Sequence, residues 1–145
     1  MSSDEALEPK ANRWRRKTAL FLLVVGGIGL TVMTQCLYPT EHPTTNLRPF
    51  DSIIRDCTVG SRRDFIVNFL GNILAFIPMG AMLETAELPR LRGRSAVAAL
   101  ALFSLVLELG QYLSGRRYAD IDDLILNTLG AAIGVGLARI VASRV

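Results

Sequence analysis

Four apolar runs, each close to the length that crosses a bilayer, constrain this sequence more than any other feature. A transmembrane helix needs about 20 mostly apolar residues, and the hydrophobic half of the 145 residues is concentrated in these runs. The runs are residues 18–38, 64–83, 95–113 and 124–141. They predict an all-α membrane protein with four transmembrane helices in one membrane domain, residues 18–145, after a basic cytoplasmic tail, residues 1–17.

The distribution of Lys and Arg predicts the orientation of these helices. Of the 16 basic residues, ten fall on the side that holds both termini and the connection 84–94. Positive residues favour the cytoplasmic side, so we expect both termini to be cytoplasmic, with the inverted orientation as the alternative. This clustering accounts for the net charge of +3 without a basic soluble face, and we therefore expect no nucleic-acid partner.

The first outer connection, residues 39–63, contains a short amphipathic pattern. Pro49 is suited to the first turn of a helix, and apolar residues recur after it with helical spacing. These residues are Phe50, Ile53, Ile54 and Cys57. The pattern predicts a short helix that lies in the membrane interface. Cys36 falls near the same side of the membrane as Cys57, which leaves a disulfide and two unpaired cysteines as alternatives.

Proline and glycine residues predict how the spans pack. Pro78 removes a backbone donor and should kink or end the second span. Gly130 and Gly134 lie four residues apart and form a small-residue seam. Such a seam permits close helix packing, either within the bundle or between copies of the chain.

Polar residues within or beside the last three runs form the candidate functional site. Such groups are costly in a bilayer, so we expect them to be functional or paired. Asn68 and Asn72 share a helix face, and Asn127 lies one turn after Asp123. In the predicted orientation these groups converge near the outer surface. The ligand-binding candidates are Asn68, Asn72, Glu108, Gln111, Arg117, Asp120, Asp122, Asp123 and Asn127.

An enzyme is one function open to these residues. Glu108 with Asp122 or Asp123 would supply an acid and a base for a reaction on a phosphate-bearing lipid. The carboxylates with asparagine carbonyls could also hold Mg²⁺ or Mn²⁺, although the sequence requires no cofactor. His42 is the only histidine, which excludes a two-histidine zinc motif.

Binding and structural roles are the alternatives. A binding protein would hold the polar part of a lipid-linked or lipophilic molecule at the outer leaflet, and Arg117 would suit a phosphate. In a structural protein the amides would hydrogen-bond across helices. Glu108 would then pair with Arg116 or Arg117, and one of the three aspartates would cap the fourth span.

Four short patterns, in order along the chain, resemble the VanZ-like family of bacterial membrane proteins. They are Asn46-Leu47-x-Pro49-Phe50, Asn68-x3-Asn72-x3-Phe76-x-Pro78-x-Gly80, Ser104-x3-Glu108-x2-Gln111 and Arg117-x2-Asp120-x-Asp122-Asp123-x3-Asn127-x2-Gly130. Arg48 departs from the first pattern, in which an apolar residue is expected.

The resemblance implies a small multi-span helical protein of the bacterial cytoplasmic membrane. The founding member of the family is linked to resistance against the glycopeptide teicoplanin. A role at the cell envelope is therefore expected, with a membrane lipid, a cell-wall lipid precursor or a lipoglycopeptide as partner. Family membership alone implies neither a mechanism nor resistance.

Overall fold

The computed structural model describes residues 16–18, 20–21, 24–27, 29, 45–86, 88, 90–114 and 119–144. Their order along the chain from residue 45 is α2 (Asp51–Thr58), α3 (Arg62–Asp64), the π-helix η2 (Phe65–Leu70), α4 (Gly71–Thr85), α5 (Arg94–Ser114) and α6 (Ile121–Ala142). Within these ranges there is no strand, only an isolated bridge between Asn46 and Asp120. The prediction of a helical protein is confirmed for this part of the chain.

Three helices are long and apolar enough to cross a membrane: Phe65–Thr85, Arg94–Leu113 and Ile121–Ala142. They correspond to the predicted second, third and fourth spans. The predicted first span, residues 18–38, and the tail, residues 1–17, fall largely outside the described residues. The short helix predicted after Pro49 is present as α2.

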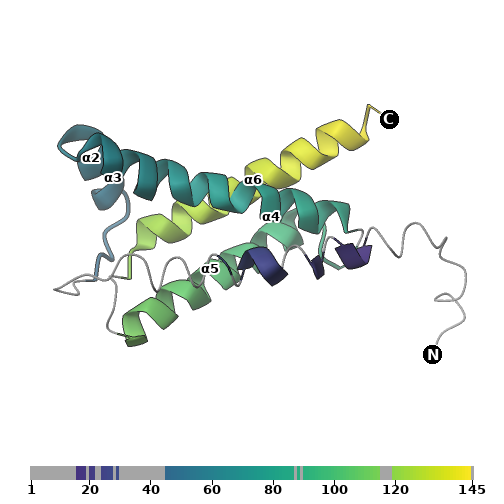
Figure 1. Ribbon diagram of the computed structural model, residues 1–145, viewed down its shortest axis with the longest axis horizontal. Helices are drawn as coiled ribbons and strands as arrows, with labels where there is room; N and C mark the ends of the chain where they lie inside the picture. Colours follow the sequence, from purple (N-terminus) through teal and green to yellow (C-terminus); the bar gives the residue numbers. More distant parts are fainter. Residues whose placement is uncertain are drawn as a thin grey trace, which may run out of the picture.

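Close packing of α4 on α6 organises the bundle. The two helices cross near their middles, and α5 packs on α6 as well (Figure 1). An added Cβ at Gly130 or Gly134 would overlap the carbonyl oxygen of Ile73 or Ile77, and one at Gly80 would overlap that of Ala131. The predicted small-residue seam therefore lies within the bundle, where it lets two helix backbones approach closely.

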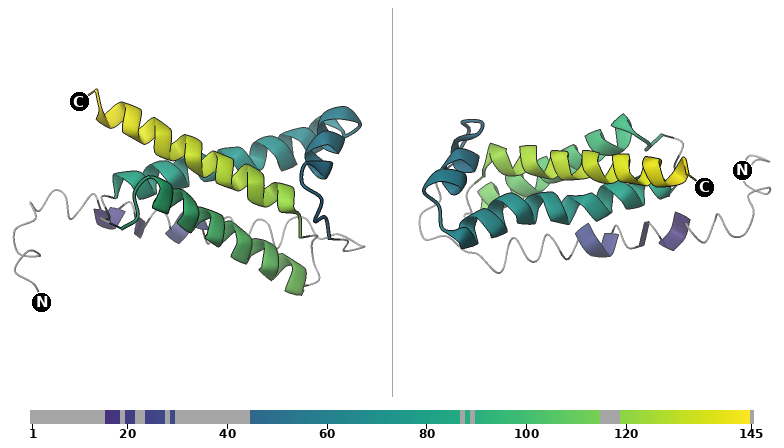
Figure 2. Two further views of the ribbon diagram at one scale, coloured as in Figure 1. Left: turned by 180° about the vertical axis from the view of Figure 1, so that it is seen from behind. Right: turned by 90° about the horizontal axis from the view of Figure 1, so that it is seen from above.

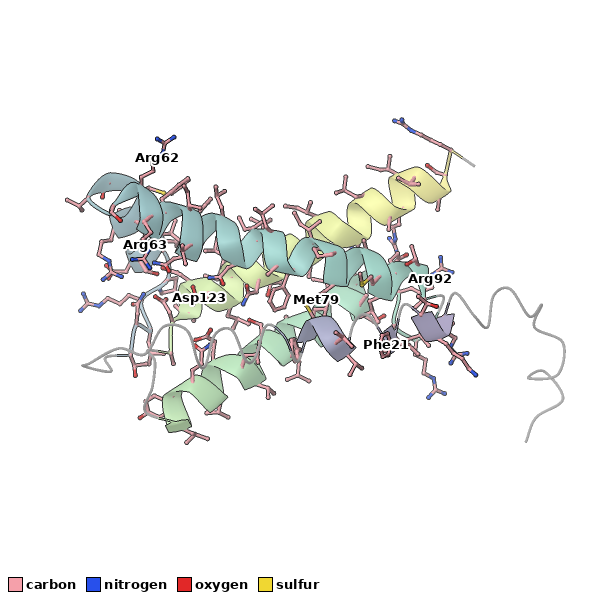
Figure 3. The ribbon with its side chains drawn as sticks, in the orientation of Figure 1. Phe21, Arg62, Arg63, Met79, Arg92 and Asp123 are labelled. Carbon is pink, nitrogen blue, oxygen red and sulfur yellow. The ribbon has the colours of Figure 1, made fainter. Side chains whose placement is uncertain are left out.

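The buried core is small, and the outer faces of the three long helices are apolar. The core cluster centres on Phe76, which is fully buried, and on Met79 near the middle of the molecule (Figure 3). Large side chains such as Leu102, Leu113 and Val141 point outward and are exposed. A bundle with this outer surface suits a lipid environment, because lipid tails replace water around it.

The helical span that contains α4 is irregular. It begins as the π-helix Phe65–Leu70 and continues as the α-helix Gly71–Thr85, with Pro78 inside the latter. The helix runs past Pro78 to Thr85, so Pro78 does not end it, and the kink, which was the alternative, stays a prediction. Proline is tolerated within membrane helices because neighbouring groups satisfy the backbone carbonyl that loses its donor.

Glu84 links the turn between α4 and α5 to the end of α6 through hydrogen bonds. Its carboxylate is buried and accepts hydrogen bonds from the Gly93 N–H at 2.6 Å and from Arg139 Nε at 2.9 Å. Arg92 Nε lies 3.7 Å from the same carboxylate. Gly93 has a φ of 58°, a conformation that favours glycine and directs its N–H to Glu84. The sequence pattern had placed Glu84 in the connection rather than in the helix.

Glu84→Gln should destabilise the protein by roughly 1 to 3 kcal/mol, because a buried acceptor of charge-assisted hydrogen bonds becomes neutral. The measurement is unfolding of the full chain in detergent, together with Arg139→Gln and the double variant. The double variant should lose less than the sum of the two single losses. Arg94→Gln, at an exposed position beside the same turn, is the control. Additive losses would show that Glu84 and Arg139 do not interact.

Candidate functional site

The predicted site residues within the described part gather toward one end of the bundle. Asp123 lies at the same end as Arg62 and Arg63, whereas Arg92 and Phe21 lie at the opposite end (Figure 3). The views in Figure 2 place α2 at the first end and the end of α6 at the other. Arg116 and Arg117 lie outside the described residues, as does Cys36 of the disulfide alternative. Cys57 is an exposed, free thiol on α2.

Asp120 joins three segments at the start of α6. Its side chain caps α6 by accepting from the Asp122 N–H at 2.9 Å, and it also accepts from the Asn46 amide at 3.0 Å. Its own N–H donates to Glu108 Oε2 on α5 at 2.9 Å. The backbone of Asn46 pairs with Ala119 and Ile121. The predicted cap by one of the aspartates is thus confirmed as Asp120.

Asp122 supplies the missing cap of α2. Phe50, at the start of α2, has a left-handed φ of 69° and makes no side-chain cap. Asp122, only 1% exposed, accepts instead from the N–H groups of Phe50, Ser52 and Ile53 at 2.6, 2.9 and 3.2 Å, and from the Ser52 hydroxyl at 2.7 Å. One carboxylate from α6 therefore satisfies donors that α2 cannot satisfy itself.

Asn68 and Asn72 contact different elements, although their spacing predicted a shared face. Asn68 lies in the π-helix and donates to Asp56 of α2 at 3.1 Å. Asn72 lies in α4 and donates to Asp123 of α6 at 2.5 Å. The π-helix that carries Asn68 ends at Leu70, and Asn72 lies one turn further along, in the α-helix, where α6 rather than α2 supplies the acceptor. Asp56, which is buried, is a site residue that the sequence reasoning missed.

A third polar contact joins α5 and α6. Ser104, Glu108 and Gln111 are buried at helical spacing on one face of α5. Asn127 of α6 donates from its amide to the Ser104 hydroxyl at 2.8 Å. Asn127 therefore faces α5, whereas Asp123, one turn earlier, contacts α4. The side-chain carbonyl oxygen of Asn127 is buried and accepts no hydrogen bond from the described residues.

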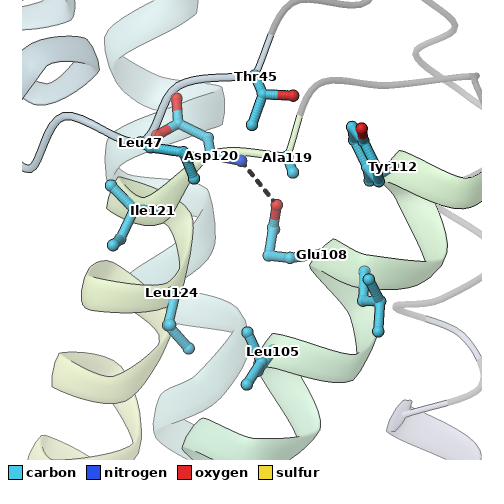
Figure 4. Close-up of a pocket in the computed structure, with 10 residues that line it drawn as sticks. Thr45, Leu47, Leu105, Glu108, Tyr112, Ala119, Asp120, Ile121 and Leu124 are labelled. Atoms are coloured by element: carbon cyan, nitrogen blue, oxygen red, sulfur yellow. Dashed lines mark hydrogen bonds between the residues drawn. The ribbon is translucent and has the colours of Figure 1, made fainter.

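A cavity of about 460 Å³ lies between the end of α5 and the start of α6 (Figure 4). Its polar lining comes from Glu108, Asp120 and Thr45. The remaining lining residues are Leu47, Leu105, Leu109, Tyr112, Ala119, Ile121 and Leu124. Glu108 is 7% exposed, while Leu105, Leu109 and Tyr112 are about half exposed. The cavity therefore combines a carboxylate with apolar walls.

The carboxylates of this end do not form a metal site among the described residues. No group of three or more His, Cys, Asp and Glu side chains converges there. Asp122 is directed to the backbone of α2, Asp123 to Asn72 and Glu108 to the Asp120 N–H. The single polar site expected from the sequence is thus divided into separate hydrogen-bonded contacts and one cavity.

A comparison with protein families finds that the VanZ/LLP1 family model matches residues 17–142 of the chain. Comparison with curated proteins and with solved structures finds no match. The family match covers most of the chain, including the three apolar helices and every candidate site residue. The chain belongs to the VanZ-like family of membrane proteins.

Proposed function

We propose that this VanZ-like protein acts at the cell envelope by binding a lipid-linked or lipophilic molecule in the cavity between α5 and α6. The observation that carries the proposal is the Glu108 carboxylate, nearly buried in a cavity whose walls are otherwise largely apolar. An ionisable group at such a position is costly, which favours a functional role over a purely structural one.

The chemistry of the cavity defines the kind of ligand. The aliphatic walls suit an acyl or isoprenoid chain, and the half-exposed Leu105, Leu109 and Tyr112 leave a lateral opening toward lipid. Glu108 and Asp120 carry acceptor oxygens, so the polar part of the ligand would contribute a hydroxyl, amide N–H or ammonium donor. A lipoglycopeptide or a cell-wall lipid precursor combines these two parts.

Topology completes the proposal. The protein has four spans in the bacterial cytoplasmic membrane, with both termini cytoplasmic and α2 in the outer interface. Phe21 lies at the same end as Arg92, which supports a first span antiparallel to α4 (Figure 3). The cavity then opens at the outer leaflet, where a lipid-linked precursor or an externally added glycopeptide is accessible.

The remaining candidates hold the cavity in shape. Asn72 with Asp123, and Asn127 with Ser104, join α6 to α4 and to α5, respectively. These contacts support a positioning role for the asparagines, while Glu108 and Asp120 contact the ligand. A purely structural protein is the second candidate function, favoured by the number of these internal hydrogen bonds.

Glu108→Gln should weaken ligand binding by about 10-fold or more while the protein still folds, because the amide can still accept from Asp120 but loses the charge. The probe is teicoplanin, added to the full-length protein in detergent, with binding measured by thermal stabilisation. Asp51→Asn, at an exposed acid outside the cavity, is the matched control and should bind like the wild type.

The same variants separate the two candidate functions in cells. Wild type expressed in a susceptible Gram-positive host should reduce growth inhibition by teicoplanin, and Glu108→Gln at equal membrane abundance should not. Equal teicoplanin binding by wild type and Glu108→Gln would contradict the proposal. Loss of folded protein in Glu108→Gln would favour the structural role.

A further inference from the structure

We propose that the surface formed by α2 and α3 binds the headgroups of anionic phospholipids. This α2–α3 surface comprises the exposed side chains between Arg48 and Arg63. Its basic members are Arg48, Arg55, Arg62 and Arg63, and its apolar members are Phe50, Ile54 and Val59. The inference concerns a second binding surface and does not rest on the ligand of the cavity.

Acidic and basic groups are separated in this part of the molecule. Asp56 and Asp122 point inward and are satisfied by Asn68 and by the start of α2. The arginines point outward. Arg55 reaches only 3.9 Å from Asp56, and Arg62 and Arg63 form no ion pair with a described acidic side chain. Of the acids on α2, Asp51 alone is exposed, against four exposed arginines, so the described exposed side chains of the α2–α3 surface carry a net positive charge.

Apolar side chains stand exposed among these arginines. Val59 is 83% exposed, and Phe50 and Ile54 are 55% and 59% exposed. Phe50, Ile54 and Cys57 follow helical spacing, so they share one face of α2. A short helix with an apolar face and neighbouring arginines is typical of segments that lie among lipid headgroups and favour anionic lipids.

Phosphate is the group that best fits the arginines. A guanidinium offers paired donors to phosphate oxygens, and each basic residue near an anionic membrane surface strengthens binding. Figure 3 shows Arg62 and Arg63 at the α2 end of the bundle, directly before the apolar helix Phe65–Thr85. An anionic phospholipid therefore matches both the positive charge of the arginines and the exposed apolar side chains of the α2–α3 surface, in whichever leaflet this end lies.

The test uses Cys57 as a reporter on the α2–α3 surface. Full-length protein with Cys36→Ser is labelled at Cys57 with an environment-sensitive fluorophore in neutral detergent. Phosphatidylglycerol should shift the emission to shorter wavelength at a concentration at least 10-fold below that of phosphatidylcholine. Glycerol phosphate without acyl chains should give no shift. Arg62→Gln with Arg63→Gln should raise the half-saturating phosphatidylglycerol concentration about 30-fold.

Arg90→Gln with Arg94→Gln removes the same charge from exposed positions in and after the α4–α5 turn and is the matched control, with an expected change below about twofold. If the Arg62 and Arg63 glutamine pair fails to fold, substitution of both by lysine tests the paired donors and should weaken binding several-fold. The proposal would be overturned by equal responses to the two phospholipids or by equal effects of the two arginine pairs. It would also be overturned if glycerol phosphate alone, or self-association of the protein, caused the emission shift.

Discussion

Gly134→Val should separate α4 from α6 and destabilise the bundle by on the order of 3 kcal/mol or more. The first added carbon would already overlap the Ile77 carbonyl oxygen, which belongs to a helix backbone and cannot rotate away as a side chain does. The helices must therefore move apart along the seam, and van der Waals contacts that hold membrane helices together are lost. Unfolding of the full chain in detergent, followed by circular dichroism, measures the loss.

Gly136 provides a matched control in the same helix. An added Cβ there has no heavy atom within 4 Å. Gly136→Ala should be neutral or should stabilise α6 by up to about 1 kcal/mol, because alanine favours helix more than glycine does. If Gly134→Val were as stable as Gly136→Ala, the close approach of α4 and α6 would be wrong.

The seam belongs to the features that could be predicted from the sequence. Glycines four residues apart within an apolar run suffice to indicate close packing, and run length suffices to locate the spans. The observed spans Phe65–Thr85 and Arg94–Leu113 agree with the predicted ones within a few residues. The last span begins at Ile121 rather than at residue 124, because the Asp120 cap allows acids in its first turn.

The partners of the polar residues could not be predicted in this way. Asp122 accepts from the backbone N–H groups of Phe50 and Ile53. Every residue except proline carries such a donor, so residue type does not reveal which N–H groups a carboxylate will bind. The change from π-helix to α-helix falls between Asn68 and Asn72, at Leu70 and Gly71, and the residue types around it did not indicate which elements the two asparagines contact. Polar residues at a common depth thus indicated a shared site, although the structure directs them to different helices.

The partners of Glu84, at the opposite end of the bundle from Asp122, could not be predicted from the sequence either. An acid beside an arginine-rich turn is expected to be a solvated surface residue. Its burial depends on Gly93 and on Arg139, which is distant in sequence. The cavity beside Glu108 likewise depends on the segment around Leu47 returning to the start of α6. Tertiary contacts of this kind cannot be predicted before the fold is known.

Asp122→Ala should release α2 from the bundle while α4, α5 and α6 remain folded. Three N–H groups at the start of α2 lose their acceptor, and Phe50 has no side-chain oxygen with which to replace it. Leaving such donors unsatisfied should lower the free energy of local opening by about 3 kcal/mol or more. Amide hydrogen exchange at Ser52 and Ile53 should therefore accelerate about 100-fold or more.

Asp51→Asn is the control for this prediction, because Asp51 is an exposed acid in the first turn of the same helix. Its loss should change the stability of α2 by less than about 1 kcal/mol. Unchanged exchange at Ser52 in Asp122→Ala would show that Asp122 does not anchor α2. If exchange accelerates as expected, Leu47 at the cavity rim should remain in place, because Asn46 is held separately by Asp120 and Ala119. Asp122→Ala would then impair the α2–α3 surface more than the Glu108 cavity, which separates the two proposed sites in a single variant.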